Sequence, residues 1–328
     1  MISAGYFRLA AILVSSLLSA TASAQGDPAS GYPNKPIRMI VAFAAGAGTD
    51  IVARLVGQDL SVALGQPVVV ENKVGASGFI GTEFVAKAKP DGYTLMMAPS
   101  SVITINPVIY KTLPYSSTRD FVPVSMVVSF PLFLVVNSTE SIKSVAGLVE
   151  YVKANPAKAN YGGSSGLFQL ALELFKLQTG THIEFVRYKG TNETASAVMS
   201  GEVLMTITDA AAATPPLRSN KVRGLAVTAS KRVALFPDVP TMAEAGLPKL
   251  EVLGWMGMFS PATTPAPVVR RLETEVMRIA RLAAFKEHVN ALQVDPAGSS
   301  SEEFAGVIAS DLGRWMDVAK TAGIKPVD

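Results

Sequence analysis

The residues best suited to chemistry are glycines and hydroxyl residues that cluster in short loops. Gly46-Ala-Gly48-Thr49-Asp50 follows the first apolar run of the chain and opens a helical pattern, and Gly162-Gly-Ser-Ser-Gly166 precedes another helical pattern. Glycine lets the backbone approach a ligand closely, and the first amide groups of a helix have no partners within that helix. Such a loop can hold a small anion, each dipole contact contributing roughly 0.3–1 kcal/mol. An ordinary capping turn is the competing interpretation of each loop taken alone.

Two more loops occupy the same position relative to apolar runs. Ser100 and Ser101 follow the run 94–98, and Lys189-Gly190-Thr191 follows the run that ends at Tyr188. All four loops stand at the carboxyl ends of expected strands, where open α/β sheets bind their ligands. The four loops together therefore predict one binding site.

A serine hydrolase is the main enzymatic alternative. Gly162 to Gly166 fits the G-x-S-x-G pattern of a nucleophile elbow, with Ser164 as the nucleophile. Such an enzyme needs an acid and a histidine later in the chain, for example Asp209 or Asp238 with His288. However, His288 lies in a pattern typical of a solvated helix, and the chain has no HGGG-type oxyanion segment.

Composition removes much other chemistry. The chain has no cysteine and two histidines, so it cannot form disulfides, cysteine-ligated zinc sites, iron–sulfur clusters or a histidine-rich metal centre. The first glycine loop lacks the third glycine of a dinucleotide fingerprint, because Ile51 stands there, and no Gly-Lys-Ser/Thr phosphate loop occurs. The net charge of +3 is scattered. We therefore expect no metal, no cofactor and no nucleic-acid partner.

Residues 1–24 fit the pattern of an export signal. Arg8 is the one charge before Asp27, and it precedes an apolar stretch over 9–20 that ends in Ala22-Ser-Ala24. A membrane span needs roughly 18–20 apolar residues, more than this stretch provides. The pattern is that of a signal peptide over residues 1–24, cleaved after Ala24. We expect an exported, periplasmic protein without a lipid anchor, since no cysteine is present.

Length and periodicity predict two lobes. A chain of 328 residues exceeds the roughly 250–300 residues that one core supports, and 49% hydrophobic residues provide ample core material. Alternation of apolar runs and helical patterns indicates an α/β fold. Strands are expected at 36–43, 68–71, 94–98, 130–136, 183–188, 203–208, 224–228 and 252–259, and helices at 49–64, 145–154, 167–179, 193–200, 210–219, 268–281, 282–292 and 301–322.

The order of these elements predicts how the lobes are divided. Residues 25–128 and 252–328 are expected to form the first lobe, and residues 129–251 the second. The chain would then cross between the lobes twice, near 125–132 and 248–256. The terminal helices have no sheet of their own and are assigned to the first lobe. Ser300 with Glu303 predicts a capping box for the last of them.

Short motifs in a fixed order carry a family resemblance. They include Tyr32-Pro-Asn-Lys-Pro-Ile-Arg, Gly46-x-Gly-Thr-Asp50, Pro90-Asp-Gly-Tyr-Thr-Leu95, Pro237-Asp-Val-Pro-Thr241 and Ala243-Glu-Ala-Gly-Leu247. From about Tyr32 to the C-terminus the chain resembles the solute receptors of tripartite tricarboxylate transporters, also called the Bug family.

The resemblance implies a two-lobed periplasmic binding fold, the Venus flytrap, in which each lobe is a mainly parallel sheet flanked by helices. It implies a monomeric, non-enzymatic receptor that closes on a small organic carboxylate and delivers it to membrane permease subunits. A sensor that presents its liganded form to a signalling partner is an alternative within the same fold.

The resemblance also implies a set of ligand-binding positions. Carried over by position, these are Phe43, Ala44, Gly46, Ala47, Gly48, Thr49, Asp50, Ser100, Ser101, Ser164, Ser165, Gly166, Gly190, Thr191 and Asp209. Since Lys189 is the one lysine or arginine within these loops, helix N-termini and hydroxyl groups are expected to meet the ligand's charge. Alanines replace the usual Pro and Gly of the first loop, and Gln169 replaces a common His. The identity of the carboxylate therefore stays open among C4-dicarboxylates, tricarboxylates, acidic amino acids, nicotinate and aromatic acids.

Overall fold

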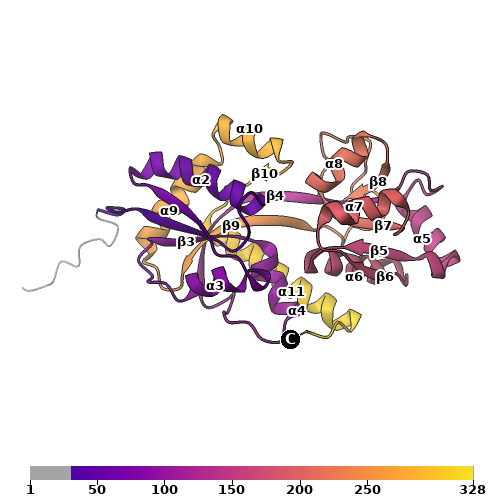
Figure 1. Cartoon of the computed structure of the whole chain (residues 1–328), viewed down its shortest axis with the longest axis horizontal. Helices are drawn as coiled ribbons and strands as arrows, with labels where there is room; N and C mark the ends of the chain where they lie inside the picture. Colours follow the sequence, from indigo (N-terminus) through magenta and orange to yellow (C-terminus); the bar gives the residue numbers. More distant parts are fainter. Residues whose placement is uncertain (1–30, 328) are drawn as a thin grey trace, which may run out of the picture.

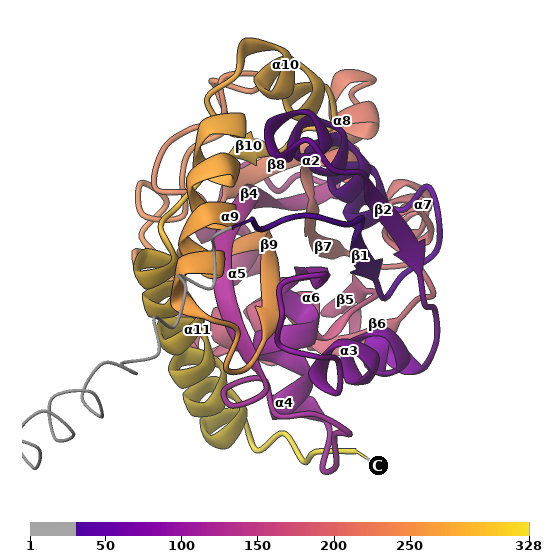
Figure 2. The same cartoon turned by 90° about the vertical axis from the view of Figure 1, so that its left-hand side faces the viewer.

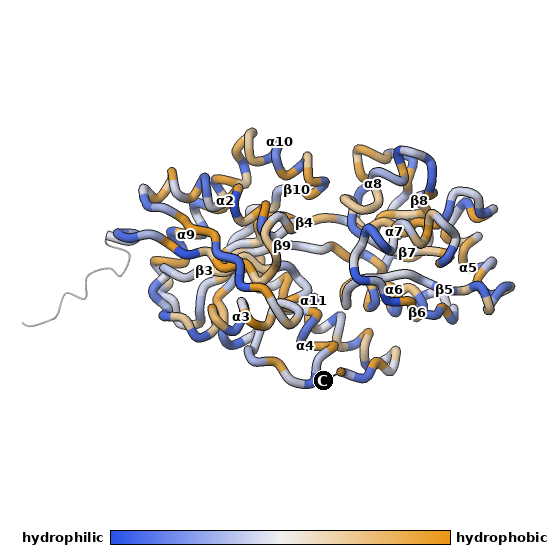
Figure 3. Tube along the Cα trace, in the orientation of Figure 1, coloured by the Kyte–Doolittle hydropathy of each residue, from blue (hydrophilic) through white to orange (hydrophobic). Residues whose placement is uncertain are grey.

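The computed structural model describes residues 31–327. The predicted signal peptide and its cleavage after Ala24 lie outside these residues. The described chain is elongated, with α/β structure at both ends (Figure 1). Hydrophobic segments occur at each end (Figure 3), which agrees with separate clusters of buried side chains there. None of the described helices is long and apolar enough to cross a membrane.

The first lobe begins with the predicted βαβ unit. Strand β1 (Ile37–Val41) pairs in parallel with β2 (Val68–Asn72) on one side and with β3 (Thr94–Pro99) on the other. Helix α2 (Gly48–Leu64) connects the first two strands and ends where Gly65 adopts a φ of 67°. That left-handed conformation favours glycine, as the sequence pattern predicted. The shorter elements are η1 (Ala76–Gly78), α3 (Phe79–Ala86), η2 (Ser101–Ile105) and α4 (Asn106–Ile109).

Alternate residues of the first sheet face different helices. Ile37, Met39 and Val41 pack in the cluster that includes α2 and α9 (Ala266–Ile279). Ile40 packs on the opposite face, in a cluster that includes side chains of α11 (Ser301–Ala322). This period of two is the signature of a strand covered on both faces. Figure 2 shows the resulting layers, with α2 and α9 on one side of the strands and α3 and α11 on the other.

Two long strands join the lobes. Strand β4 (Phe121–Asn137) pairs with β9 (Leu253–Pro261) from Phe121 to Pro131 and with β7 (Met205–Asp209) from Leu132 to Val136. These are the two crossings expected near 125–132 and 248–256. The boundaries proposed at 128/129 and 251/252 stay a prediction.

Both sheets are mixed. The expected parallel pairing is present in β2-β1-β3, and in the second lobe β5 (Asn160–Gly163) pairs in parallel with β6 (Glu184–Arg187) and β7. In contrast, β4 is antiparallel to β9, β7 and β8 (Val222–Val227), and β9 is antiparallel to β3. The cause is the double crossing, because a strand that leaves a lobe and one that returns beside it run in opposite directions.

The second lobe follows the predicted alternation. Its elements are α5 (Val145–Ala154), η3 (Pro156–Lys158), β5 (Asn160–Gly163), α6 (Gly166–Thr179), β6 (Glu184–Arg187), α7 (Thr191–Ser200), β7, α8 (Ala210–Arg218) and β8 (Val222–Val227). Helix α5 has the predicted bounds, and the Ser144 side chain caps it by accepting from the amide of Gly147 at 3.1 Å.

The terminal helices divide between the lobes. Helices α9 and α10 (Ala283–Ala291) pack on the first lobe as predicted, and β10 (Asp295–Pro296) pairs with β4. The capping box predicted at Ser300 and Glu303 is present. Helix α11, however, packs Phe304 in the first lobe and Trp315 in the core cluster of the second. Its 22 residues span about 33 Å at 1.5 Å per residue, which is long enough to reach both lobes.

Candidate functional site

The four loops meet at one cavity between the lobes. Its volume is about 750 Å³, and residues of both lobes line it. Ten of the fifteen predicted positions are in the lining, namely Phe43, Gly46, Gly48, Thr49, Ser100, Ser101, Ser164, Ser165, Thr191 and Asp209. We call this cavity the cleft.

Five predicted residues do not line the cleft, namely Ala44, Ala47, Asp50, Gly166 and Gly190. Ala44 is exposed, whereas Asp50 is buried behind the first loop. Gly166 packs against the other lobe, because a Cβ there would lie 2.6 Å from Cγ2 of Ile105.

Asp50 anchors the first loop. It accepts hydrogen bonds from the amide of Gly46 at 2.8 Å and from Nδ2 of Asn72 at 2.8 Å, and it pairs with Arg54. Nδ2 of Asn72 also donates to the carbonyl of Phe43 at 2.9 Å. Burial alone would raise the pKa of Asp50, but hydrogen bonds from Arg54, Gly46 and Asn72 outweigh burial and lower that pKa. The network fixes the loop in front of α2.

Four helices begin at the cleft, since residues of the first turns of α2, α6, α7 and α8 line it. The capping residues Ala47, Ser165 and Gly190 make no side-chain hydrogen bond to the starts of α2, α6 and α7. Asp209 does cap α8, and its Oδ1 accepts from the amide of Ala212 at 2.9 Å. Uncapped first turns present amide donors and partial positive charge to a bound anion.

Asp209 is the ionisable side chain in the lining. Burial raises its pKa, and hydrogen bonds from the amide of Ala212 and the hydroxyl of Thr191 oppose that shift. No lysine, arginine or histidine of residues 31–327 lines the cleft. An anion bound there must therefore be held by helix N-termini, backbone amides and hydroxyl groups.

The residues needed by a serine hydrolase are not gathered here. Ser164 lines the cleft, but neither His182 nor His288 does, and both of these side chains are exposed. His288 lies on α10, as its helical pattern indicated. Within residues 31–327, no three acidic or histidine side chains lie close enough together to hold a metal ion.

The sequence reasoning missed part of the lining. The missed residues are Ile51, Val52, Pro99, Phe130, Leu167, Phe168, Asn192, Ala210, Ala211, Ala212, Met256, Leu292, Gln293 and Val294. Phe130 and Met256 lie on the strands that cross between the lobes, so the predicted crossings were a signal for them. Residues 292–294 follow α10, and only the tertiary fold brings them to the cleft.

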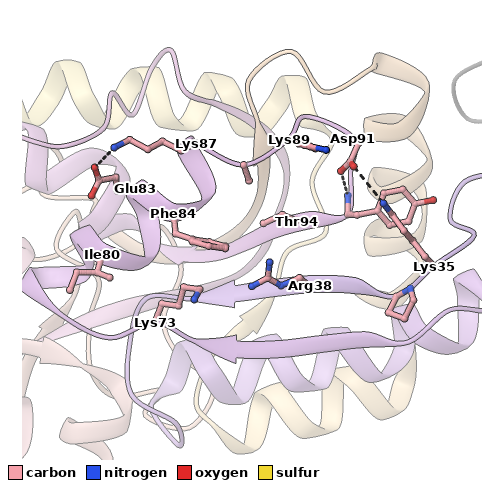
Figure 4. A pocket seen from close by; sticks show the side chains of 13 residues that line it. Lys35, Arg38, Lys73, Ile80, Glu83, Phe84, Lys87, Lys89, Asp91 and Thr94 are labelled. Carbon is pink, nitrogen blue, oxygen red and sulfur yellow. Dashed lines mark hydrogen bonds and ion pairs between the residues drawn. The ribbon is translucent and has the colours of Figure 1, made fainter.

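A larger cavity lies elsewhere and is not the candidate site. It has a volume of about 910 Å³ and lies at the amino ends of β1 and β3, where Lys35 and Arg38 line it (Figure 4). Nζ of Lys73 lies 4.3 Å from the centroid of the Phe84 ring, and Nε of Arg38 lies 2.6 Å from Oε1 of Glu71. We call this cavity the basic groove. It gathers none of the predicted loops, since those follow the carboxyl ends of the same strands.

Comparison with known proteins decides the family. Residues 52–324 match the tripartite tricarboxylate transporter family receptor. The chain belongs to this family. BugT of Bordetella pertussis is 36% identical to the receptor over 299 residues, which cover 90% of this chain and 91% of BugT. The resemblance stated from the motifs is thus confirmed.

Solved structures agree with the fold of the receptor. An R. palustris protein solved with adipate is 34% identical, with a TM-score of 0.78 over 90% of this chain and 100% of that protein. The periplasmic binding protein BugD is 32% identical, with a TM-score of 0.74 over 90% and 100% of the two chains. The receptor has the two-lobed α/β fold of these periplasmic binding proteins. Its family and structural relatives are solute-binding proteins.

Proposed function

We propose that this receptor captures a small organic carboxylate in the cleft and delivers it to the membrane permease of a tripartite tricarboxylate transporter. One observation carries the proposal. Loops from both lobes, with the N-termini of α2, α6, α7 and α8, converge on a cavity that no cationic side chain of residues 31–327 lines. Helix N-termini are established anion sites, and a ligand held from both lobes favours the closed form.

Thermal unfolding of the chain from residue 25 onward tests capture. The panel should include adipate, because a relative was solved with it. A carboxylate present at 100 times its dissociation constant should stabilise the folded state by about 2.7 kcal/mol, seen as a higher Tm. Uncharged amides of the same acids serve as matched controls and should leave the Tm unchanged. If no carboxylate raises the Tm, the proposal fails.

Delivery and export rest on the family relationship and need separate measurements. Cells that lack this receptor should lose uptake of the carboxylate that stabilises it, and restoring the receptor should restore uptake. Unchanged uptake, with loss of a transcriptional response to the same carboxylate, would instead support the sensor alternative. Sequencing the N-terminus of the mature protein should give Gln25 as the first residue.

A further inference from the structure

The four helix N-termini at the cleft differ in their acidic residues. Helix α2 carries Asp50 in its first turn, α7 carries Glu193, and α8 is capped by Asp209. Helix α6 has no acidic residue in its first turn. A carboxylate near a helix N-terminus offsets the partial positive charge there. Among the four helices, all within the described part of the chain, α6 therefore offers the most favourable place for a ligand carboxylate.

Helix α2 ranks second. The guanidinium of Arg54 pairs with Asp50 and compensates part of its charge, but the Arg54 side chain is 51% exposed and screened by water. Asp209 at α8 has no such cationic partner in the lining of the cleft. A second carboxylate on a ligand would therefore lie nearer to an acidic side chain than the first.

Serine side chains reinforce the start of α6. Ser100 is 3% exposed and lines the cleft. Ser101 begins η2, and Ile105 of this element packs against Gly166 at the start of α6. Hydroxyls from the first lobe thus line the cleft beside those of Ser164 and Ser165. A serine hydroxyl can donate a hydrogen bond, so these side chains are suited to a ligand oxygen.

The rest of the lining is largely apolar. It includes Phe43, Ile51, Val52, Phe130, Leu167, Phe168, Met256, Leu292 and Val294. These side chains come from both lobes and from the crossing strands. Burying apolar ligand surface against them is favourable roughly in proportion to the area removed from water. A ligand with a large apolar body gains this contribution, whereas a small, highly charged ligand does not.

Phe130 forms the part of this wall that lies where the chain crosses between the lobes. It pairs with Gly254 across the two crossing strands, and a Cβ at position 254 would overlap the Phe130 ring. Glycine at position 254 therefore leaves the space that the Phe130 ring occupies. Because Phe130 also packs on the core of the second lobe, the ring is supported from behind.

We propose that the cleft selects a carboxylate with one charge and a bulky apolar body, best matched by an aromatic monocarboxylate, over di- and tricarboxylates. The inference rests on the proposed function of the cleft. The carboxylate lies at the start of α6 among Ser100, Ser164 and Ser165, and the apolar body lies against Phe130 and Met256. Phe130 is then a specificity-determining residue.

Calorimetric titration of the receptor with benzoate, succinate and citrate tests the inference. Benzoate should bind at least about tenfold more tightly than either of the other acids. Phe130→Ala should weaken benzoate binding by about tenfold and leave succinate binding nearly unchanged. Phe130→Leu, which keeps most of the apolar volume, should show a smaller loss. Phe84→Ala is the matched control, since Phe84 is also half-buried but lines the basic groove.

The wild-type ranking alone decides the inference, even if a Phe130 variant does not fold. Tighter binding of succinate or citrate than of benzoate would overturn the selection proposed here and leave carboxylate capture intact. Equal loss of benzoate affinity in Phe84→Ala and Phe130→Ala would remove Phe130 as the determinant. Absence of binding by all three acids and by the wider panel would instead overturn the proposed function itself.

Discussion

At the scale of the residue, the cleft combines neutral hydrogen-bond donors with an absence of basic side chains among the described residues. Its polar groups are hydroxyls, amides and the carboxyl of Asp209, and no basic side chain of the described residues lines it. Binding of an anion by neutral donors keeps the desolvation cost low, because no buried positive charge has to be compensated when the cleft is empty. Asp209 is then the residue whose charge opposes a bound carboxylate most directly.

Replacing this carboxyl should strengthen binding. Asp209→Asn keeps an oxygen that can accept from the amide of Ala212 and removes the negative charge. Two unit charges roughly 8–10 Å apart repel each other by about 1–2 kcal/mol at an effective dielectric constant of about 20. Removing the charge of Asp209 should therefore raise carboxylate affinity by about that amount at neutral pH. Burial raises the pKa of Asp209, so wild-type binding should strengthen as pH falls towards that pKa, and the variant should lack this trend. Titration across pH measures both effects, and a loss of affinity in Asp209→Asn would show that the ligand donates to this residue.

At the scale of the element, the loop between β1 and α2 owes its shape to a network at the start of α2. Asp50 ties the loop at Gly46 to Asn72 of β2 and to Arg54 of the same helix. The sequence predicted the helix, its glycine stop and the loop correctly. The sequence also predicted that Asp50 lines the cleft, which it does not. A residue two positions into a helix can face either the ligand or the supporting strand, and only the tertiary pairing with Asn72 settles its direction.

Asp50 should make stability depend on acid pH. Its folded-state pKa is lowered, so its contribution is complete above the unfolded-state pKa and is lost as pH falls through the folded-state pKa. Asp50→Asn should reduce the free energy of unfolding by about 1–3 kcal/mol at neutral pH and make acid unfolding less steep. Asp59→Asn on the same helix is the control and should change neither quantity. Denaturant unfolding at several pH values measures this, and equal behaviour of the two variants would contradict the anchoring role of Asp50.

At the scale of the whole molecule, local patterns predicted the elements and long-range pairing decided how they are joined. The helical periods, the capping residues Ser144 and Ser300, and the order of strands in each lobe could all be read from the sequence. The antiparallel pairing of β4 with its neighbours could not, because it depends on strands far apart in the chain. Nor could the position of α11, whose Phe304 and Trp315 enter the cores of different lobes. A helix shared by both lobes limits how freely they can move apart.

Two cavities formed by residues 31–327 differ in charge: neutral donors and Asp209 line the cleft, whereas several lysines line the basic groove. The central claim is that a carboxylate binds in the smaller of the two. Calorimetric titration with the most stabilising carboxylate of the panel, on wild type, Ser164→Ala and Lys73→Ala, tests this claim most directly. We predict that Ser164→Ala weakens binding by roughly 0.5–3 kcal/mol and that Lys73→Ala leaves it unchanged. Loss of binding in Lys73→Ala with full affinity in Ser164→Ala would place the ligand in the basic groove and contradict the account.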